Sequence, residues 1–413
     1  MFALQRFGIK LGLETITDIL DGLGNPHRNY RCIHVAGTNG KGSIASGLTA
    51  ALRCAGYKTG LYTSPHLVRF NERIAINGVP ITDERVVAGY QAVKAVHGGD
   101  REPTFFEFAT AMALWEFAAQ KVDWAVIETG MGGRLDATNV LTPALSVITN
   151  ISVEHGEYLG NTIARVAYEK AGIIKPGVPA VTGVTQKSAI SALEKKAAEE
   201  NAPLFRLGKD FRIRRSRTGF TYHGMDHTWK QMETSLLGRF QAENAAIVAA
   251  ASEVLIRSGA ADISEADIRR GLIENRWPGR LEVVSQQPLL ILDGAHNLAA
   301  ARELGRYMAT DLAGRRITLV VGILDDKPYR AMLDHLIPAC ARVVLTQPVI
   351  GRALSAQTLR AAIAPTCHDI TVIPKVAEAV RHAIETSGPD DVVVVAGSLY
   401  VVGEAKETLA AFG

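Results

Sequence analysis

A glycine-rich segment near the N-terminus carries residue types that bind phosphate. Residues 37–43 read GTNGKGS and stand between an apolar, β-branched run and a helical pattern. Glycines let backbone N–H groups turn toward phosphate oxygens, and the N-terminus of the following helix adds partial positive charge. Lys41 can neutralise an anion, and the Ser43 hydroxyl can reach a magnesium ion. The segment therefore predicts a site for nucleotide phosphates.

This segment departs from the standard phosphate-loop pattern, G-x-x-x-x-G-K-[ST]. Gly42 stands between Lys41 and Ser43, whereas in the standard pattern the hydroxyl residue follows the lysine directly. The alternative interpretation is a glycine-rich turn between a strand and a helix that binds nothing. Three glycines, a lysine and a serine within seven residues argue against that alternative.

The elements that position this segment follow an α/β pattern. Short β-branched runs alternate with longer helical patterns, which is typical of layers built around mostly parallel sheets. In the first part of the chain the pattern predicts strands over residues 31–36, 59–63, 124–128 and 145–149. It predicts helices over residues 43–55, 106–120, 162–171 and 241–257, the last of them largely buried. Residues 210–229 alternate around glycines and predict a β-hairpin excursion.

A second α/β series begins near Leu281. Its predicted strands cover residues 289–292, 317–321, 343–346, 369–372 and 392–396. The turn-rich stretch NRWPGR at residues 275–280 separates the two series. We therefore predict two domains, residues 1–283 and residues 284–413, the second smaller and doubly wound.

Composition narrows the class of protein. Apolar residues make up 47% of the 413 residues and charged residues 21%, which excludes a disordered chain. A net charge of +3 gives no general attraction to nucleic acid or to an anionic membrane. The four cysteines are scattered, and neither a long apolar run nor an apolar N-terminal signal region is present. We expect a cytoplasmic monomer that binds small molecules.

Several stretches resemble one family of enzymes. HVAGTNGKGS at residues 34–43 resembles the ATP loop of the Mur-type amide ligases, specifically of the folylpolyglutamate synthase and dihydrofolate synthase family. Further stretches resemble the same family in its own order: TSPHLVRFNERI (63–74), TFFEF (104–108), ETGMGGRLDATN (128–139), EKAGIIKPG (169–177), WPGRLE (277–282), LDGAHN (292–297), DDKPY (325–329) and GSLY (397–400). Together they extend over almost the whole chain.

The resemblance implies a two-domain ligase, with an N-terminal ATPase domain, a C-terminal glutamate-ligase domain and catalysis in the cleft between them. The implied reaction joins a pteroyl carboxylate to the amine of L-glutamate through an acyl phosphate made from ATP. Two alternatives stay open: a Mur ligase of cell-wall precursor synthesis, and a paralogue that binds nucleotide without turnover. The stretches at residues 63–74 and 132–139 argue against the first alternative, and the presence of Lys41, Glu128, His155 and Lys170 argues against the second.

The resemblance also assigns roles to individual residues. For ATP it implies Asn39, Gly40, Lys41, Gly42, Ser43, Asn244, Arg280, Asp293 and His296. For magnesium, at two sites, it implies Ser43, Ser64, Glu128, His155 and Lys170, and it adds a requirement for potassium. The catalytic set is Lys41, His155 and Lys170. Glu154 stands where the family usually has Asp, and Leu298 where it commonly has Pro; we expect both changes to be tolerated.

Lys170 is the most specific of these assignments. In the family the matching lysine is carbamylated by CO₂, and the carbamate is an anionic oxygen ligand for a second magnesium ion. The alternative interpretation is an ion pair with Glu169 or with an aspartate, which is the usual arrangement of a helical lysine.

The resemblance places the pteroyl group on the first domain. Its matching residues are Leu11, Gly12, Thr104, Phe105, Phe106, Glu107, Leu135, Asp136 and Ala137. The two phenylalanines could stack on a flat heteroaromatic ring, although adjacent phenylalanines at a helix start are more often part of the core. Members that also use dihydropteroate often have Asp before the Leu-Gly pair, where this chain has Lys10. That difference weakens the prediction of the dihydropteroate step more than that of glutamate addition.

Overall fold

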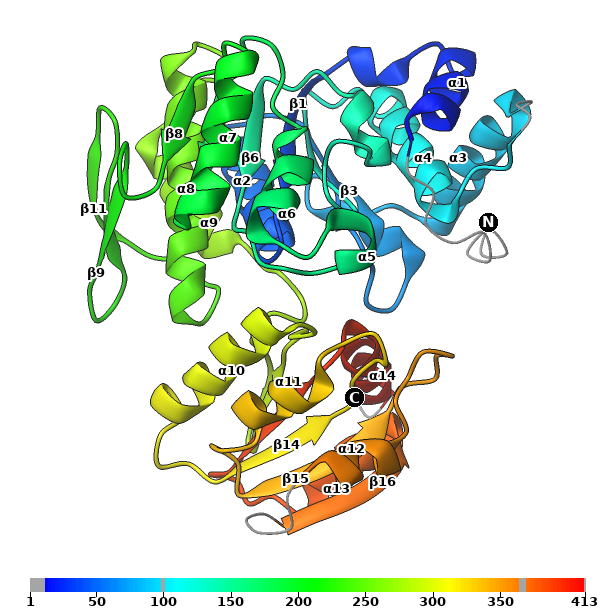
Figure 1. Ribbon diagram of the computed structural model, residues 1–413, viewed down its shortest axis with the longest axis vertical. Coiled ribbons are helices and arrows are strands. Elements are labelled where there is room, and N and C mark those ends of the chain that lie inside the picture. Colours follow the sequence, from blue (N-terminus) through cyan, green and yellow to red (C-terminus); the bar gives the residue numbers. More distant parts are fainter. Residues whose placement is uncertain (1–11, 98–100, 364–368, 412–413) are drawn as a thin grey trace. The chain divides into compact units, whose positions relative to one another are not determined.

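The computed structural model describes residues 12–97, 101–363 and 369–411, which form two compact units (Figure 1). The first unit runs to Ser235 and resumes over Gln241–Arg276, and the second contains Leu236–Phe240 and the chain from Trp277 onward. The chain therefore passes between the units after Ser235, before Gln241 and after Arg276. Residue 284, where the sequence predicts the domain boundary, lies inside strand β12 (Glu282–Gln286).

An eight-stranded sheet organises the first unit, in the order β4-β3-β2-β5-β1-β6-β7-β8. Its parallel strands are β1 (Arg31–Ala36), β2 (Thr59–Tyr62), β5 (Trp124–Glu128), β6 (Leu145–Ile148), β7 (Ala180–Thr182) and β8 (Leu204–Arg206). The antiparallel edge consists of β3 (Ile74–Ile76) and β4 (Val79–Pro80). Strand β1 lies at the centre, between β5 and β6, so the loop that follows it opens at the carboxyl edge of the sheet.

Helices cover both faces of this sheet, as parallel strands require. Helices α6 (Ile163–Ala171) and α7 (Lys187–Glu199) pack together in front of the sheet in Figure 1, and α2 (Lys41–Cys54) lies behind it. Helix α2 packs on β1, β2 and β5 and on α9 (Glu265–Glu274). Beside it runs α8 (Arg239–Arg257), so close that a Cβ at Gly47 would lie 2.9 Å from Val248. The remaining helices are α1 (Glu14–Gly22), α3 (Asp83–Val96), α4 (Phe105–Ala119) and α5 (Gly156–Leu159).

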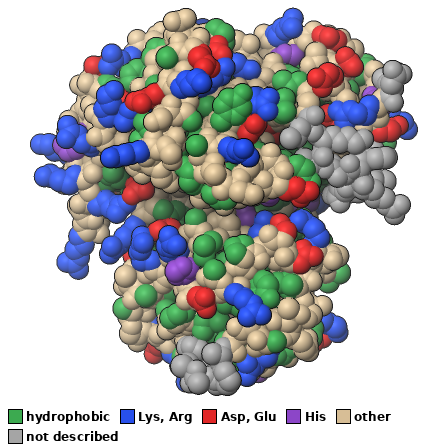
Figure 2. All heavy atoms as spheres, in the orientation of Figure 1, with side chains coloured by type: hydrophobic (Ala, Val, Ile, Leu, Met, Phe, Trp, Pro, Cys, Tyr) green, Lys and Arg blue, Asp and Glu red, His purple; other side chains and the backbone are tan. Residues whose placement is uncertain are grey.

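The predicted β-hairpin excursion is a small antiparallel sheet of three strands: β9 (Arg212–Arg215), β10 (Phe220–His223) and β11 (Thr228–Met232). Its inner face is apolar, with Tyr222 and Trp229 stacked 5.1 Å apart. Its outer face is basic, and Figure 2 shows Lys and Arg side chains gathered along the edge of the molecule that this sheet forms. Among the described residues no three His, Cys, Asp or Glu side chains cluster as a metal site.

A six-stranded sheet forms the centre of the second unit, in the order β12-β13-β17-β14-β15-β16. After β12 its strands are β13 (Leu289–Leu292), β14 (Ile317–Val321), β15 (Arg342–Gln347), β16 (Asp369–Lys375) and β17 (Val392–Ala396), which are parallel to one another. The helices that cover it are α10 (Leu298–Thr310), α11 (Tyr329–Leu336), α12 (Ala356–Ala362), α13 (Val376–Glu385) and α14 (Leu399–Ala410). The predicted fold class, two α/β domains with mostly parallel sheets, is confirmed. No helix in the described parts of the chain is long and apolar enough to cross a membrane.

Candidate nucleotide and metal site

The predicted phosphate loop connects the end of β1 to the start of α2. Gly40, immediately before the helix, has φ +81°, and a Cβ there would lie 2.8 Å from Oδ1 of Asn244. A Cβ at Gly37 would lie 1.9 Å from the Thr149 hydroxyl. Neither position can hold a side chain without moving its neighbour, and Gly40 also needs a backbone conformation that favours glycine. The glycines therefore bring the loop backbone close to the neighbouring elements.

The residues that hold the loop follow strand β6. Thr149 donates its hydroxyl hydrogen to the carbonyl of Asn39 at 2.6 Å. The Asn150 side chain donates to the same carbonyl and accepts from the Asn39 N–H, both at 3.0 Å. Thr149 and Asn150 were not among the predicted site residues, although polar side chains directly after a buried parallel strand are a recognisable signal for a site at the sheet edge.

Lys41 lies over its own loop. Its ammonium group donates to the carbonyls of Gly37 and Thr38, at 3.1 and 3.2 Å, and lies 3.9 Å from the Glu128 carboxylate. Glu128 ends strand β5, is 5% exposed, and accepts a hydrogen bond from the backbone N–H of Ser64 at 3.3 Å. Three of the predicted site residues, Lys41, Ser64 and Glu128, are therefore neighbours.

The oxygen donors at the loop have the chemistry of a magnesium site. Ser43 and Glu128 are both nearly buried, and hydroxyl and carboxylate oxygens are the ligands that magnesium prefers. No cluster of three carboxylate, imidazole or thiol side chains exists in the described part of the chain. The hydroxyl oxygens and the one carboxylate at the loop fit a magnesium ion held by a few protein oxygens together with phosphate oxygens, which is the common arrangement for Mg²⁺–nucleotide sites.

Lys170 projects from α6 into the loop and is 1% exposed. Its ammonium group donates to the Gly37 carbonyl at 2.7 Å and lies 3.6 Å from Glu154. The pKa of Lys170 is lowered to about 8, first by burial and then by the charge of Lys41, while Glu154 opposes both effects. Glu169, one of the partners considered from the sequence, pairs instead with Arg134 at 3.0 Å, so Lys170 does form an ion pair, but with Glu154 and not with Glu169.

His155 and Glu154 lie between β6 and α5. His155 is exposed and has φ +48°, in the left-handed region, directly before α5 begins. The backbone turns there so that Glu154 reaches Lys170. Glu154, expected from the sequence only as a tolerated replacement for Asp, is the carboxylate partner of the buried lysine.

Asn244, on α8, lies against the loop beside Gly40. A buried asparagine needs hydrogen-bond partners, and here the side-chain NH₂ of Asn244 donates to Oε1 of Gln241 at 2.8 Å. Gln241 in turn donates from Nε2 to the Ser43 hydroxyl at 3.3 Å. Gln241 is 1% exposed and was absent from the predicted set.

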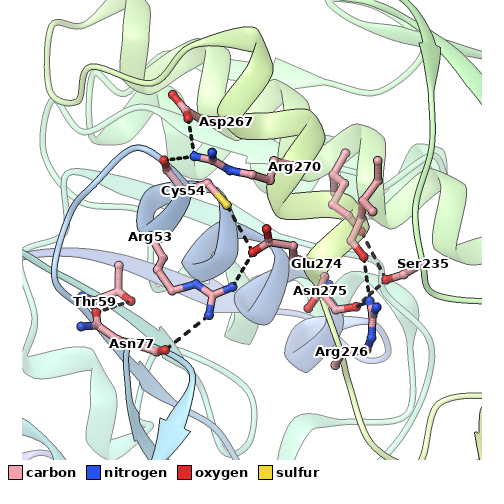
Figure 3. Close-up of polar contacts among 12 residues, drawn as sticks. Arg53, Cys54, Thr59, Asn77, Ser235, Asp267, Arg270, Glu274, Asn275 and Arg276 are labelled. Atoms are coloured by element: carbon pink, nitrogen blue, oxygen red, sulfur yellow. Dashed lines mark hydrogen bonds and ion pairs between the residues drawn. The ribbon is translucent and has the colours of Figure 1, made fainter.

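Helix α9 fixes the other side of the loop helix (Figure 3). Asn275, which ends α9, is buried, and its Oδ1 accepts from the Ser46 hydroxyl at 2.5 Å. Its backbone carbonyl accepts from the Ser235 hydroxyl. Further along the same helix pair, Arg53 pairs with Glu274 at 2.9 Å. The first turns of α2 are thus bound to residues that stand next to the crossings between the units.

Three of the predicted ATP residues lie together in the second unit, at the carboxyl end of β13. The Asp293 carboxylate accepts from the backbone N–H groups of Leu281 and Ala295, both at 2.9 Å, and is 6% exposed. Burial raises the pKa of Asp293, while the charge of Arg280 opposes the rise. His296 contacts the Gly294 carbonyl through Nδ1 at 2.8 Å. Asp293 thus shapes a turn that brings Arg280 and His296 beside Gly294.

Several residues predicted to bind the pteroyl group have structural partners. Thr104 and Glu107 form a capping box at the start of α4, with Glu107 accepting from the Thr104 N–H and hydroxyl at 2.7 and 2.8 Å. Asp136 accepts from the Met131 N–H and the Thr138 hydroxyl at 2.8 and 2.5 Å, and burial raises the pKa of its carboxyl. These contacts explain the three polar side chains without a ligand.

The remaining pteroyl candidates are apolar or glycine. Phe105 and Phe106 are half-buried against the core, where the Phe105 ring lies 6.1 Å from that of Phe70. Ala137 is buried and Leu135 is half-buried. Gly12 is described, whereas Leu11 and Lys10 lie outside the described residues. Their role in folate binding stays a prediction.

Comparisons with known proteins agree over nearly the full length. Residues 35–252 match the Mur ligase middle domain, and residues 279–399 match the Mur ligase glutamate ligase domain. A Bacillus subtilis dihydrofolate synthase/folylpolyglutamate synthase is 37% identical over 98% of this chain and 96% of its own length. The structure of E. coli FolC in complex with DHPP and ADP has a TM-score of 0.91 at 31% identity, over 98% of this chain and 94% of that one. A bifunctional enzyme from Yersinia pestis, complexed with AMPPNP and Mn ion, has a TM-score of 0.89 at 32% identity, over 98% and 94%.

Proposed function

Because the chain belongs to the folylpolyglutamate synthase and dihydrofolate synthase family of Mur ligases, we propose that it adds L-glutamate to reduced folates with ATP as the energy source. We extend the proposal to dihydrofolate synthesis from dihydropteroate, since the Bacillus subtilis relative carries both names. A divalent metal accompanies the nucleotide in the Yersinia pestis enzyme, and we propose magnesium for this chain, with potassium as a monovalent cation on the basis of the resemblance.

The observation that carries the proposal is the meeting of two lysines and two carboxylates at the phosphate loop. Lys41 and Lys170 both donate to the Gly37 carbonyl, with Glu128 and Glu154 within 3.9 and 3.6 Å of them. Lys41 can neutralise part of the charge of a polyanion bound at this loop, which is the main requirement of phosphoryl transfer, and Lys170 supplies a second, buried amine with a carboxylate beside it.

The chemistry requires this neutralisation because both reactants are anionic. A carboxylate oxygen of the folate attacks the γ-phosphorus, the bond to ADP breaks, and an acyl phosphate forms. The neutral glutamate amine then attacks the acyl carbon and an N–C bond forms; the C–O bond to phosphate breaks, inorganic phosphate leaves with the bonding electrons, and the nitrogen gives up one proton to the phosphate or to solvent. Lys41 offsets the charge that develops on the phosphates, and the loop N–H groups at the start of α2 orient them.

Ser43, Ser64 and Glu128 would hold magnesium, which supplies further positive charge between the phosphates and the carboxylate. We propose that Lys170 is carbamylated: its neutral amine adds to CO₂, an N–C bond forms, and a proton is released to solvent. The product is an anion on a side chain that would otherwise bring a second cation to the Gly37 carbonyl. His155, Asn244, Arg280, Asp293 and His296 keep their predicted roles as ligands of metal or nucleotide within this proposal.

The proposal is tested by phosphate release from purified protein with ATP, Mg²⁺ and glutamate, using tetrahydrofolate and dihydropteroate in separate reactions. We expect release with both substrates, dependent on glutamate, and none when glutamate is omitted. Release with tetrahydrofolate alone would restrict the enzyme to glutamate addition and make Lys10 the first residue to exchange. If the protein still binds ATP but releases no phosphate with either substrate, it is a nucleotide-binding paralogue without ligase activity.

A further inference from the structure

Gln241 is the first residue of the first unit after the chain returns from the second unit. It is 1% exposed, although it stands in the first turn of α8, three residues after Gly238 (φ +95°). Burying a primary amide without partners is costly, so its hydrogen bonds decide what it contributes. Both of them lead to residues of the candidate nucleotide site.

One amide group connects two of the predicted ligand residues. Nε2 of Gln241 donates to the Ser43 hydroxyl at 3.3 Å, and Oε1 accepts from the Asn244 side chain at 2.8 Å. An amide offers a donor and an acceptor on one planar group, whereas an ionised Glu has no donor and Met has no donor, so neither could serve both partners in this way. Asn244 in turn lies against Gly40, within the loop itself.

The direction of the bond to Ser43 matters for metal binding. A serine hydroxyl has two lone pairs and one hydrogen. When Nε2 of Gln241 occupies one lone pair, the other lone pair and the hydrogen are directed elsewhere by the tetrahedral geometry of the oxygen. The hydroxyl can then present a lone pair to a metal ion and its hydrogen to a phosphate oxygen, with less rotational freedom to lose on binding.

We propose that Gln241 is a positioning residue that orients the Ser43 hydroxyl and the Asn244 amide for the metal–nucleotide complex. The inference rests on the proposed function, because it assumes that Ser43 contributes to a divalent-metal site. It assigns Gln241 no contact with the reacting atoms. Gln241 would influence metal binding through Ser43 and nucleotide binding through Asn244.

The test compares the binding of ADP and of Mn²⁺·ADP by calorimetry in a double-mutant cycle of Gln241→Leu and Ser43→Ala. Losing one hydrogen bond of this kind changes affinity by roughly two- to tenfold. We therefore expect Gln241→Leu to lower the affinity for Mn²⁺·ADP by about tenfold and the affinity for ADP alone by about twofold. In the Ser43→Ala background the hydroxyl that Gln241 orients is already absent. We therefore expect Gln241→Leu to lower the affinity for Mn²⁺·ADP, relative to that for ADP, by less than about twofold.

Ser252→Ala is the matched control, because Ser252 is also buried on α8 but bonds to Val248 of its own helix. Binding by this variant should equal that of the wild type, while urea unfolding reports any general loss of stability in each variant. The inference is overturned if Gln241→Leu lowers the affinities for ADP and for Mn²⁺·ADP equally and its effect adds to that of Ser43→Ala. The proposed function would be unaffected by that result. Wild-type protein that binds no Mn²⁺·ADP would overturn the proposed function, and the inference with it.

Discussion

Lys41 and Lys170 donate hydrogen bonds to the same backbone oxygen, that of Gly37, at 3.1 and 2.7 Å. They come from helices α2 and α6, which lie on opposite faces of the sheet. Two ammonium groups on one carbonyl repel each other. Burial first, then the charge of Lys41, lower the pKa of Lys170 to about 8, so the loop contains a buried amine that loses its proton readily.

The readily deprotonated amine leads to a prediction about CO₂. At pH 7.5 a lysine with a pKa of about 8 is neutral in roughly a quarter of the molecules, against about 0.1% for an ordinary lysine. We expect protein equilibrated with ¹³C-bicarbonate to show a carbamate resonance that Lys170→Arg abolishes and Lys175→Arg retains. The control is matched because burial also lowers the pKa of Lys175.

Loss of the carbamate should also reduce catalysis. Removing a group that orients or supports a metal ligand typically costs about 10- to 100-fold in metal affinity or activity, and we expect phosphate release by Lys170→Arg to fall by at least that factor. A carbamate signal that persists in Lys170→Arg would show that another amine is modified.

The same lysine makes stability depend on pH in a defined direction. The folded-state pKa of Lys170 lies near 8 and the unfolded value is 10.5, so between these values the unfolded chain binds more protons. The free energy of unfolding therefore rises with pH across this window. Below about pH 8 Lys170 is charged in the folded protein, and the full free-energy cost of burying that charge lowers stability. Relative to Lys170→Met, the free energy of unfolding of the wild type should rise by up to about 1.4 kcal/mol per pH unit between pH 8 and 10.

The measurement is urea unfolding of both proteins at pH 7, 8.5 and 10 in CO₂-free buffer, so that carbamate formation does not contribute. Taking the difference between the two proteins removes the contribution of the other groups that titrate in alkali. A difference that stays constant across the three pH values would show that Lys170 does not titrate in this window.

The sequence alone predicted the elements that carry strong periodicity. The limits of β1, β5, β13, β14 and β17 agree with the predicted strands residue for residue, because each is a short, mostly buried run. Strands β3, β4, β7 and β8 were not predicted, since a strand of two or three residues shows no alternation of its own, and β12, at the predicted domain boundary, was not predicted either. Their pairing depends on neighbouring strands that only the folded chain brings together.

The site shows the same division between local and long-range information. The loop glycines, Lys41 and Ser43 are consecutive in the sequence, so their chemistry could be inferred directly. Gln241 lies 198 residues from Ser43, and Glu154 is 16 residues from Lys170, so neither partnership has a local signal. Thr104 and Glu107 carried a capping-box signature that competes with their predicted role in folate binding.

Glu253 is a buried carboxylate with a structural role. It is fully buried on α8 and accepts from the Tyr222 hydroxyl at 2.6 Å and from the backbone N–H groups of Met225, Asp226 and His227 at 2.8–3.0 Å. Burial alone raises the pKa of Glu253, but these hydrogen bonds outweigh burial and lower it. The stability it contributes is therefore complete above the unfolded pKa of 4.5 and is lost as the pH falls through the lower, folded value.

Glu253→Gln should lower the free energy of unfolding by about 1–3 kcal/mol, because the amide NH₂ faces donors that it cannot satisfy. Glu243→Gln, on the same helix, removes a half-exposed ion pair with Arg215 and should change stability by less than about 1 kcal/mol. Urea unfolding at pH 7 measures both. Binding of ADP should be unchanged in Glu253→Gln, and its loss without loss of stability would give this carboxylate a role in the site.

Gly40 allows backbone strain to be separated from a local clash. Its φ is +81° and a Cβ would lie 2.8 Å from Asn244, whereas Gly56 has a similar φ of +92° and nothing within 4 Å of the same position. Alanine at either position costs about 1–2 kcal/mol of stability through the left-handed backbone. Only Gly40→Ala also displaces Asn244 from the loop, so we expect it to weaken ADP binding at least about tenfold while Gly56→Ala binds normally. Calorimetry with ADP measures the affinities and urea unfolding the stabilities; equal affinities in the two variants would mean that Asn244 does not contribute to the nucleotide site.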